Sequence, residues 1–268
     1  MTDSEILVVD PGVITVLRLD RPRVHNALNA ALLEELDAAL ARAVTTSSVR
    51  AVVITGSGDR AFSAGADLDE LAGLSSERAH DVLSAGQQVI SRVAACPLPV
   101  IAAVNGLALG GGFELALAAT LPVLAEHATL GLPEAGLGLI PGYGGTQRLV
   151  RAVGPRVAAH TMITGQRLTA ARAHELGLTP LPPVGDGSVL DVALDVAEEI
   201  ATCGPRAVRS ILTAIRASGD ANAEVGLALE SALAGLSTGS AEAAEGIAAF
   251  REKRRPDFRA VDLGSVNP

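Results

Sequence analysis

Two glutamates in an apolar part of the chain are the residues best suited to chemistry. Glu114 and Glu134 lie in the segment Val100–Gly145, which is otherwise rich in alanine, leucine and glycine. Burial raises the pKa of a carboxyl group, and two carboxyls in one apolar cleft differ in proton affinity, so such a pair can move protons near neutral pH. Each residue alone has a plainer interpretation: Glu114 as an acid that complements a helix dipole, and Glu134 as a solvated loop residue.

Three consecutive glycines, at residues 110–112, stand just before the first glutamate. Apolar residues recur after them, at Phe113 and at 115–117, which predicts a helix that begins at the glycines. The first N–H groups of a helix lack internal partners, so they can hold an oxyanion or a polarised carbonyl oxygen. A tight turn is the simpler interpretation of the glycines alone. A second small-residue turn, at 63–67, follows a strand predicted over 51–55.

The remaining pattern predicts the elements that must hold these residues in place. Strands are expected within 5–19, around a turn at Asp10-Pro11-Gly12, and a helix follows Asn29, which can cap it. The other expected elements are strands at 49–55, 100–104, 122–126 and 129–132, a loop at 56–68, and helices at 68–74, 77–95, 112–119 and from 145. After a boundary rich in proline and glycine, only helices are predicted, at 188–202, 205–218, 222–236 and 239–254. We therefore predict an α/β core over residues 1–187 that holds the site, and a helical region over residues 188–268.

Composition narrows the class of protein. The chain has 268 residues, of which 49% are hydrophobic and 19% charged, so it is long and apolar enough to bury a sizeable core. The net charge of −9 argues against a nucleic-acid binder. Cys96, Cys203 and the five histidines show no metal-ligand spacing, which favours reduced thiols and a cytoplasmic location. The acidic start predicts no signal peptide, and polar residues break the longest apolar run too early for a membrane span.

Five motifs, in order along the chain, resemble those of the enoyl-CoA hydratase (crotonase) family. They are HNALN from His25, AFSAGADL from Ala61, NGLALGGGFEL from Asn105, LPEAGLGLIPGYGGTQRL from Leu132 and EGIAAFREKRRPDF from Glu245. The resemblance runs from about Ile14 to Phe258. It implies an α/β fold in which ββα turns form a superhelix, with the sites between layers. It also implies that the C-terminal helices cover the coenzyme site and build homo-trimers, commonly paired into hexamers.

The resemblance also implies roles for the residues singled out above. The N–H groups of Ala66 and Gly111 would bind a thioester carbonyl oxygen and hold the enolate that forms on attack. Glu114 and Glu134 would hold one water, whose oxygen goes to the β carbon of a trans-2-enoyl-CoA and whose proton goes to the α carbon. Glu134 is the expected proton donor and Glu114 the partner that activates water. The implied product is 3-hydroxyacyl-CoA, and no metal or other cofactor takes part, because coenzyme A belongs to the substrate.

Further residues match the family's contacts to coenzyme and substrate. Arg23 is the implied basic partner of the phosphates, with Val24 and His25 beside it. The other matching positions are Ala64, Asp67, Leu68, Phe250 and Lys253. Tyr143 is tolerated in the family and, close to Glu134, is expected to contact substrate. Without the resemblance, the basic run 253–255 is better explained as the solvated end of a helix that complements its dipole. Two positions depart from the family's usual pattern: Phe113 either narrows the acyl site or fills the core, and Thr120 replaces a frequent aspartate.

The sequence is compatible with three functions. The first is hydration of a short or medium 2-enoyl-CoA, which the presence of both glutamates favours. The second is an isomerase or another crotonase-type reaction on the same oxyanion hole, which needs only one placed carboxylate. The third is a catalytically weak acyl-CoA-binding protein, because catalysis demands tighter placement than binding does. The segment 71–81 is too weakly patterned to predict acyl chain length, and several pathways use this chemistry.

Overall fold

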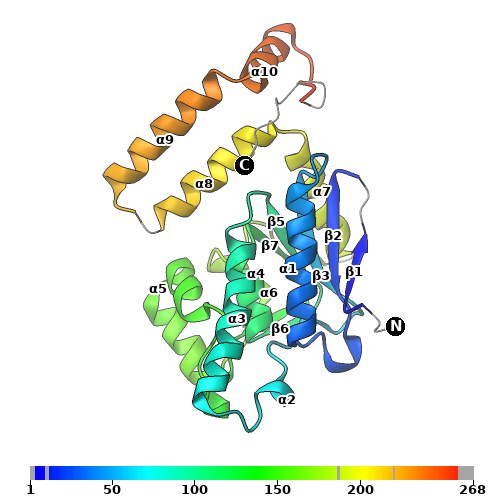
Figure 1. Cartoon of the computed structure of the whole chain (residues 1–268), viewed down its shortest axis with the longest axis vertical. Coiled ribbons are helices and arrows are strands. Elements are labelled where there is room, and N and C mark those ends of the chain that lie inside the picture. Colours follow the sequence, from blue (N-terminus) through cyan, green and yellow to red (C-terminus); the bar gives the residue numbers. More distant parts are fainter. Residues whose placement is uncertain (1–3, 10–11, 186–187, 220, 259–268) are drawn as a thin grey trace.

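Repeated strand–strand–helix turns build the core of the molecule (Figure 1). The computed structural model describes residues 4–9, 12–185, 188–219 and 221–258, so the predicted turn at Asp10-Pro11 and the last ten residues lie outside it. A first antiparallel pair, β1 (Ile6–Val9) and β2 (Ile14–Leu19), leads through η1 (Pro22–Val24) to α1 (Ala30–Thr45). The second turn consists of β3 (Ala51–Gly56), β4 (Ala61–Ser63), α2 (Leu68–Leu71) and α3 (Ser76–Ala94). The third consists of β5 (Val100–Val104), β6 (Leu107–Leu109) and α4 (Gly111–Ala118). The fourth consists of β7 (Leu121–Leu124), β8 (Thr129–Gly131), η2 (Glu134–Leu137) and α5 (Gly145–Thr164). This order confirms the predicted α/β class.

From β3 on, the two strands of each turn join different sheets. The first strands extend a five-stranded sheet of order β1-β2-β3-β5-β7, and the second strands form a sheet of order β4-β6-β8-β9, where β9 is Leu168–Thr169. Within the first sheet β2, β3, β5 and β7 run parallel. Every residue of β3 and β5 is buried, which explains why both read as continuous apolar runs rather than as alternating patterns. The loops after β4, β6 and β8 are thereby brought to one edge of the second sheet.

Capping and apolar spacing position α1 as the sequence predicts. Asn29 Oδ1 accepts the N–H of Leu32 at 2.9 Å, which supplies one of the hydrogen bonds that a helix start lacks. Leu32, Leu36 and Leu40 recur every four residues and are buried on one face. An ion pair between Asp37 of α1 and Arg92 of α3 links the two helices on their exposed side.

The C-terminal helices fall into two groups. Helix α7 (Val189–Ala201) packs against β3 and β5 and buries Ala193 and Ala197, after α6 (Ala170–Glu175) has covered β8 and β9. Helices α8 (Pro205–Ser218), α9 (Ala223–Thr238) and α10 (Ala241–Glu252) extend away from the sheets in Figure 1, and we call them the arm. The four predicted helices are confirmed. The division of the chain at residues 187/188 stays a prediction.

A carboxylate from the end of the arm caps its beginning. Gly204, at the N-cap of α8, has no side chain to offer. Instead Glu242 of α10 is buried and accepts the N–H groups of Arg206 at 3.0 Å and Ala207 at 3.4 Å. The first turn of α8 therefore depends on a residue of α10.

Several local predictions need correction. The expected loop at 56–68 contains strand β4, and the helix expected at 68–74 ends at Leu71. Strands β6 and β9 and helix α6 were not predicted, because segments of two to six residues are too short to show a period. Phe113 is 1% exposed and fills the core. Thr120 Oγ1 accepts the N–H of Val100 at 3.0 Å, so the departure at this position has a local role.

Candidate active site

A pocket of about 610 Å³ lies where three loops meet. The β4–α2 loop, the start of α4, and the segment from η2 to the start of α5 form its walls. The residues expected from the sequence that line it are Val24, Ala64, Ala66, Asp67, Leu68, Gly111, Glu114, Glu134 and Tyr143. Arg23, His25, Phe250 and Lys253 are not among the lining residues of the described chain. The structure thus brings together both glutamates and both expected N–H donors.

Two backbone N–H groups, both unpaired in the described chain, belong to residues that line the pocket, Ala66 and Gly111. Leu28 pairs with Ala66 in a parallel bridge, in which Leu28 N–H donates to Gly65 O at 2.8 Å and Asp67 N–H donates to Leu28 O at 3.0 Å. The N–H of Ala66 itself takes no part in this bridge. Gly111 opens α4, so its N–H lacks a helical partner. Within the described chain neither N–H makes a hydrogen bond.

Close contact between the two loops sets the spacing of these donors. A Cβ atom on Gly65, whose φ is +98°, would lie 3.0 Å from Gly111 N. A Cβ atom on Gly111 would lie 3.3 Å from Ala66 N. Only glycine fits this approach and this backbone angle without strain. The arrangement can donate two hydrogen bonds to a single oxygen atom, as an oxyanion hole does.

Glu114 lies in the first turn of α4 and is buried, with 1% of its surface exposed. Its Oε1 accepts the N–H groups of Tyr143 at 2.8 Å and Gly145 at 2.6 Å, the latter at the start of α5. Burial raises the pKa of Glu114 to about 7, although these two donors oppose the rise, and the nearby charge of Glu134 adds to it. This carboxyl group can therefore gain and lose a proton near neutral pH.

Glu134 begins η2 and faces the glycine turn before α4. A Cβ atom on Gly110 would lie 3.0 Å from Glu134 Oε1. Glu134 Oε2 is buried and has no hydrogen-bond partner among the described residues. Burial raises the pKa of this carboxyl group as well. It receives no N–H from another residue of the described chain, and only its own backbone N–H opposes the rise.

Tyr143 contacts both Gly111 and Glu114. Its ring occupies the space left by two glycines: a Cβ atom on Gly86 would lie 2.5 Å from Cε1, and one on Gly111 would lie 2.7 Å from Cδ2. Its carbonyl accepts Arg148 Nη1 at 2.7 Å, while its N–H holds Glu114. Burial, with the charges of Glu114 and Glu70, raises the pKa of Tyr143 to about 12, so the phenol stays neutral. The ring and the backbone of Tyr143 thus position both the Gly111 N–H and the Glu114 carboxylate.

The residues expected near the coenzyme are spread more widely. Arg23 is exposed and has no ion pair or hydrogen bond within the described chain, so its charge is available. The backbone of His25 has a left-handed conformation, with φ +55°, and its carbonyl accepts the N–H of Ala64 at 2.9 Å. The carboxylate of Asp67 is engaged with Arg21 at 2.8 Å. Phe250 and Lys253 belong to the end of the arm, which lies opposite α2 along the long axis in Figure 1.

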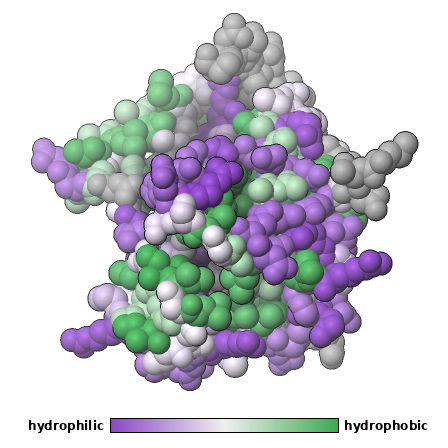
Figure 2. Space-filling view, turned by 60° about the horizontal axis from the view of Figure 1, so that its bottom comes forward, coloured by the Kyte–Doolittle hydropathy of each residue, from purple (hydrophilic) through white to green (hydrophobic). Residues whose placement is uncertain are grey.

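Sequence reasoning missed several residues around the pocket. Leu83 of α3 and Leu71 line its wall, and Leu137, Leu139 and Ile140 form its rim together with Leu68. These four rim side chains are between 44% and 78% exposed. Figure 2 shows apolar side chains gathered on the face that Figure 1 has at its bottom, where α2 lies. The signal for the rim was the apolar run LGLI, which begins three residues after Glu134. Arg21, Gly86 and Arg148 gave no such signal.

Neither a metal-binding cluster nor a membrane-spanning helix is present in the part of the chain that the structure describes. In that part of the chain, no group of three or more His, Cys, Asp or Glu residues could hold a metal ion. The expectation that no metal takes part in the reaction stays a prediction. Over the same residues, none of the helices combines the length and the apolar character needed to cross a bilayer.

Comparison with known proteins identifies the family. A sequence model of the family described as enoyl-CoA hydratase/isomerase matches residues 10–261. The chain is 41% identical to the 2,3-dehydroadipyl-CoA hydratase of Escherichia coli, over 96% of this chain and 99% of that one. It is 36% identical to the crotonyl-CoA hydratase of Syntrophomonas wolfei, over 96% and 99%. A crystal structure of an enoyl-CoA hydratase from Bacillus anthracis has a TM-score of 0.90 at 38% identity, covering 96% of this chain and all of that one.

The stacked ββα turns are therefore those of a crotonase-type fold, as the sequence motifs implied. The chain belongs to the enoyl-CoA hydratase/isomerase family.

Proposed function

We propose that this protein hydrates trans-2-enoyl-CoA thioesters to 3-hydroxyacyl-CoA. One observation carries the proposal: the carboxyl groups of Glu114 and Glu134 border the same pocket as the unpaired N–H groups of Ala66 and Gly111. Moving a double bond within the acyl chain needs one carboxylate, whereas adding water needs a base and an acid at two neighbouring carbons. The presence of two placed carboxyls therefore favours hydration over isomerisation.

The proposed reaction follows from the positions of these groups. The thioester oxygen accepts the N–H groups of Ala66 and Gly111, which polarises the conjugated double bond. Glu114 takes a proton from water as the water oxygen bonds to the β carbon, and the electron pair moves to the thioester oxygen as an enolate. When the enolate collapses, the α carbon takes a proton from Glu134. Transfer of a proton from Glu114 to Glu134 then restores the starting state, so the net change is the addition of one water.

Hydrogen bonding supports this division of roles. The anion of Glu114 is stabilised by the N–H groups of Tyr143 and Gly145, which suits the residue that starts ionised. Glu134 Oε2 is buried without a donor, which suits the residue that starts protonated. Burial raises the pKa of both carboxyl groups, which supports a part for each of them in proton transfer.

Other features support binding of a coenzyme A ester by an oligomer. Arg23 offers an unpaired positive charge next to Val24 at the pocket, as a phosphate-binding residue requires. The arm carries exposed apolar side chains at Ile211, Ile215, Val225, Leu227, Leu236 and Phe250, and α9 buries no residue. We propose that the arm packs against other copies in a trimer or hexamer, where Phe250 and Lys253 of one copy reach the coenzyme site of another. A cytoplasmic location stays a prediction.

Loss of the conjugated enoyl-thioester absorbance with crotonyl-CoA tests the proposal. The wild type should turn over, and Glu114→Gln and Glu134→Gln should each lose at least about 10³-fold in kcat, because each removes a proton-transfer group from a pair that acts together. Glu77→Gln is the matched control, since Glu77 lies at the exposed start of α3. Its kcat should equal that of the wild type.

Other outcomes separate the alternatives. A wild type that binds crotonyl-CoA and longer 2-enoyl esters without consuming them would contradict hydration. Gain of conjugated absorbance from a 3-enoyl-CoA would then indicate isomerisation, and binding without any reaction would indicate a binding protein. The names of the two relatives refer to different acyl groups, so kinetics over this substrate series identify the acyl chain that the protein accepts.

A further inference from the structure

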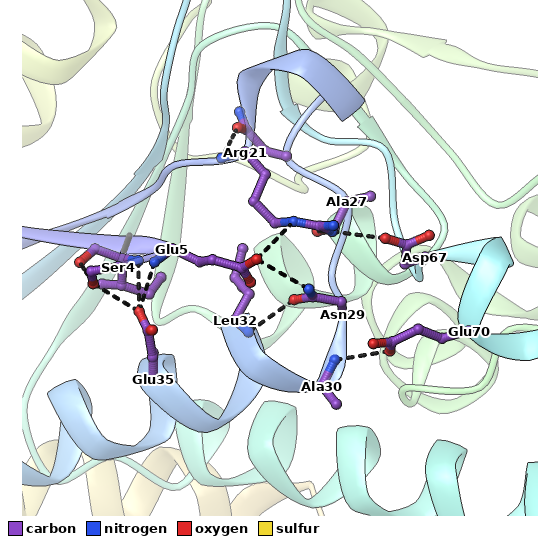
Figure 3. Close-up of polar contacts among 12 residues, drawn as sticks. Ser4, Glu5, Arg21, Ala27, Asn29, Ala30, Leu32, Glu35, Asp67 and Glu70 are labelled. Carbon is purple, nitrogen blue, oxygen red and sulfur yellow. Dashed lines mark hydrogen bonds and ion pairs between the residues drawn. The ribbon is translucent and has the colours of Figure 1, made fainter. Parts of the chain in front are cut away.

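The guanidinium group of Arg21 joins two segments that border the pocket (Figure 3). Its Nη1 donates to Ala27 O at 2.7 Å and to Asp67 Oδ2 at 2.8 Å. Its Nε lies 3.3 Å from Glu5 Oε1, on the β1 side. Arg21 itself does not line the pocket, whereas Ala27 and Asp67 do.

These contacts enclose the bridge that orients Ala66. Ala27 precedes Leu28, and Asp67 follows Ala66; Leu28 and Ala66 are the bridge partners. One nitrogen of Arg21 thus holds the two partner segments together beside the bridge. The Gly65 carbonyl and the Asp67 N–H both point toward Leu28. The C=O and N–H of one trans peptide group point in opposite directions, so the N–H of Ala66, which shares a peptide group with the Gly65 carbonyl, points away from Leu28.

Asp67 is held from both sides. Its Oδ1 accepts the N–H of Asp69 and caps α2, while its Oδ2 accepts Arg21. The Arg21 and Asp67 side chains are only 19% and 16% exposed, so solvent screens this pair less than a surface pair. Glu70 adds a second link, because its Oε2 accepts the N–H of Ala30 at the start of α1. The turn that carries Ala66 is therefore tied to α1 through side chains.

We propose that Arg21 is a positioning residue that fixes the direction of the Ala66 N–H toward the thioester oxygen, an inference that rests on the proposed function. A displacement of a donor by about 1 Å can cost about 100-fold in rate. Nη1 of Arg21 makes both of these bonds while Nε of the same planar group lies against Glu5, an arrangement that the single ammonium group of lysine does not reproduce.

Two measurements on Arg21→Gln, Arg21→Lys and Asp67→Asn test this role. The first is the split between kcat and KM with crotonyl-CoA: we expect kcat to fall about 10- to 100-fold in Arg21→Gln, with KM within about threefold. The second is the infrared stretch of butyryl-CoA labelled with ¹³C at its thioester carbonyl. The wild type should shift this band to lower frequency on binding, and the variants should lose at least about half of the shift.

Two controls separate positioning from general damage. Arg92→Gln removes a different arginine–carboxylate pair, between α3 and α1, and should keep the wild-type kcat and carbonyl frequency. Asp67→Asn still caps α2 but loses the charge, so it tests the link even if Arg21→Gln does not fold. The proposed positioning role of Arg21 is overturned if folded Arg21→Gln or Asp67→Asn keeps the wild-type carbonyl shift, whether or not kcat changes. A wild type that shifts the carbonyl but does not hydrate crotonyl-CoA or any longer 2-enoyl ester overturns the proposed hydration alone.

Discussion

The inner and outer walls of the pocket are built in different ways. The inner wall consists of Ala66, Gly111, Glu114 and Tyr143; the last two are almost fully buried, and backbone hydrogen bonds and glycine contacts hold the wall in place. The outer wall is the rim of Leu68, Leu137, Leu139 and Ile140, whose side chains are largely exposed. A change in the inner wall must disturb packing, whereas the rim can change freely. We infer that the inner wall determines the chemistry and the rim determines which acyl chain is accepted.

A methyl group added to the inner wall, compared with one added next to the rim, gives the sharpest contrast. In Gly111→Ala the new Cβ would meet the Tyr143 ring at 2.7 Å and Ala66 N at 3.3 Å, so both the ring and the donor must move. We expect kcat to fall at least about 100-fold and the free energy of unfolding to fall by about 1–3 kcal/mol. The matched control is Gly136→Ala in η2, where a Cβ would meet nothing within 4 Å. Equal kcat values for the two variants with crotonyl-CoA would contradict the distinction between the walls.

The pH dependence of kcat/KM tests the protonation states of the two carboxyls. Below pH 7 Glu114, whose pKa is raised to about 7, becomes protonated and no base remains, so kcat/KM should fall about tenfold per pH unit. Burial raises the pKa of Glu134 too, so its ionisation also contributes to the profile. A profile that stays flat from pH 5 to pH 9 would contradict the raised pKa of Glu114.

Substitution in the rim should change selectivity with little effect on stability. Ile140 is 78% exposed, so Ile140→Ser removes little buried surface. We expect KM for longer 2-enoyl esters to rise several-fold, kcat for crotonyl-CoA to stay within about twofold, and the free energy of unfolding to stay within about 0.5 kcal/mol. Steady-state kinetics over a series of chain lengths checks this. A uniform loss of kcat across the series would place the rim in the chemistry instead.

A further contrast within the inner wall concerns the stability cost of burying Glu114. Its pKa is near 4.5 when unfolded and about 7 when folded, so ionisation favours the unfolded chain: this penalty is absent below pH 4.5 and complete above pH 7. Glu114→Gln avoids the penalty and should be more stable than the wild type by at most about 3 kcal/mol at pH 8, with a smaller difference at pH 5. Thermal melts at both pH values measure this. An advantage that is larger at pH 5 would contradict the raised pKa.

The predictions from sequence succeeded where the signal was local and long. Helix α1, the buried strand β5 and the four C-terminal helices each extend over enough residues to show a cap, a period or an apolar run. Strand β4 has three residues and was predicted as part of a loop, because its identity comes from pairing with β6, more than 40 positions away. Short elements of this kind depend on contacts that the sequence pattern does not contain.

The same limit applies to the site. Both glutamates, the glycine turn and Ala66 could be singled out, since unusual residue types in an apolar region and a family resemblance carried the signal. The roles of Tyr143 N–H and of Arg21 could not, because each acts through a partner that is distant along the chain: Glu114 in one case and Asp67 in the other. Such contacts become visible only when the loops are placed together.

The cap that Glu242 provides for α8 has a consequence for how the arm forms during synthesis. Arg206 and its capping carboxylate are 36 positions apart, so the first turn of α8 leaves the ribosome well before the group that completes it. Until then, the N–H groups at this helix start depend on water. The arm should therefore gain its final order in one late, cooperative step after α10 has been made, rather than helix by helix.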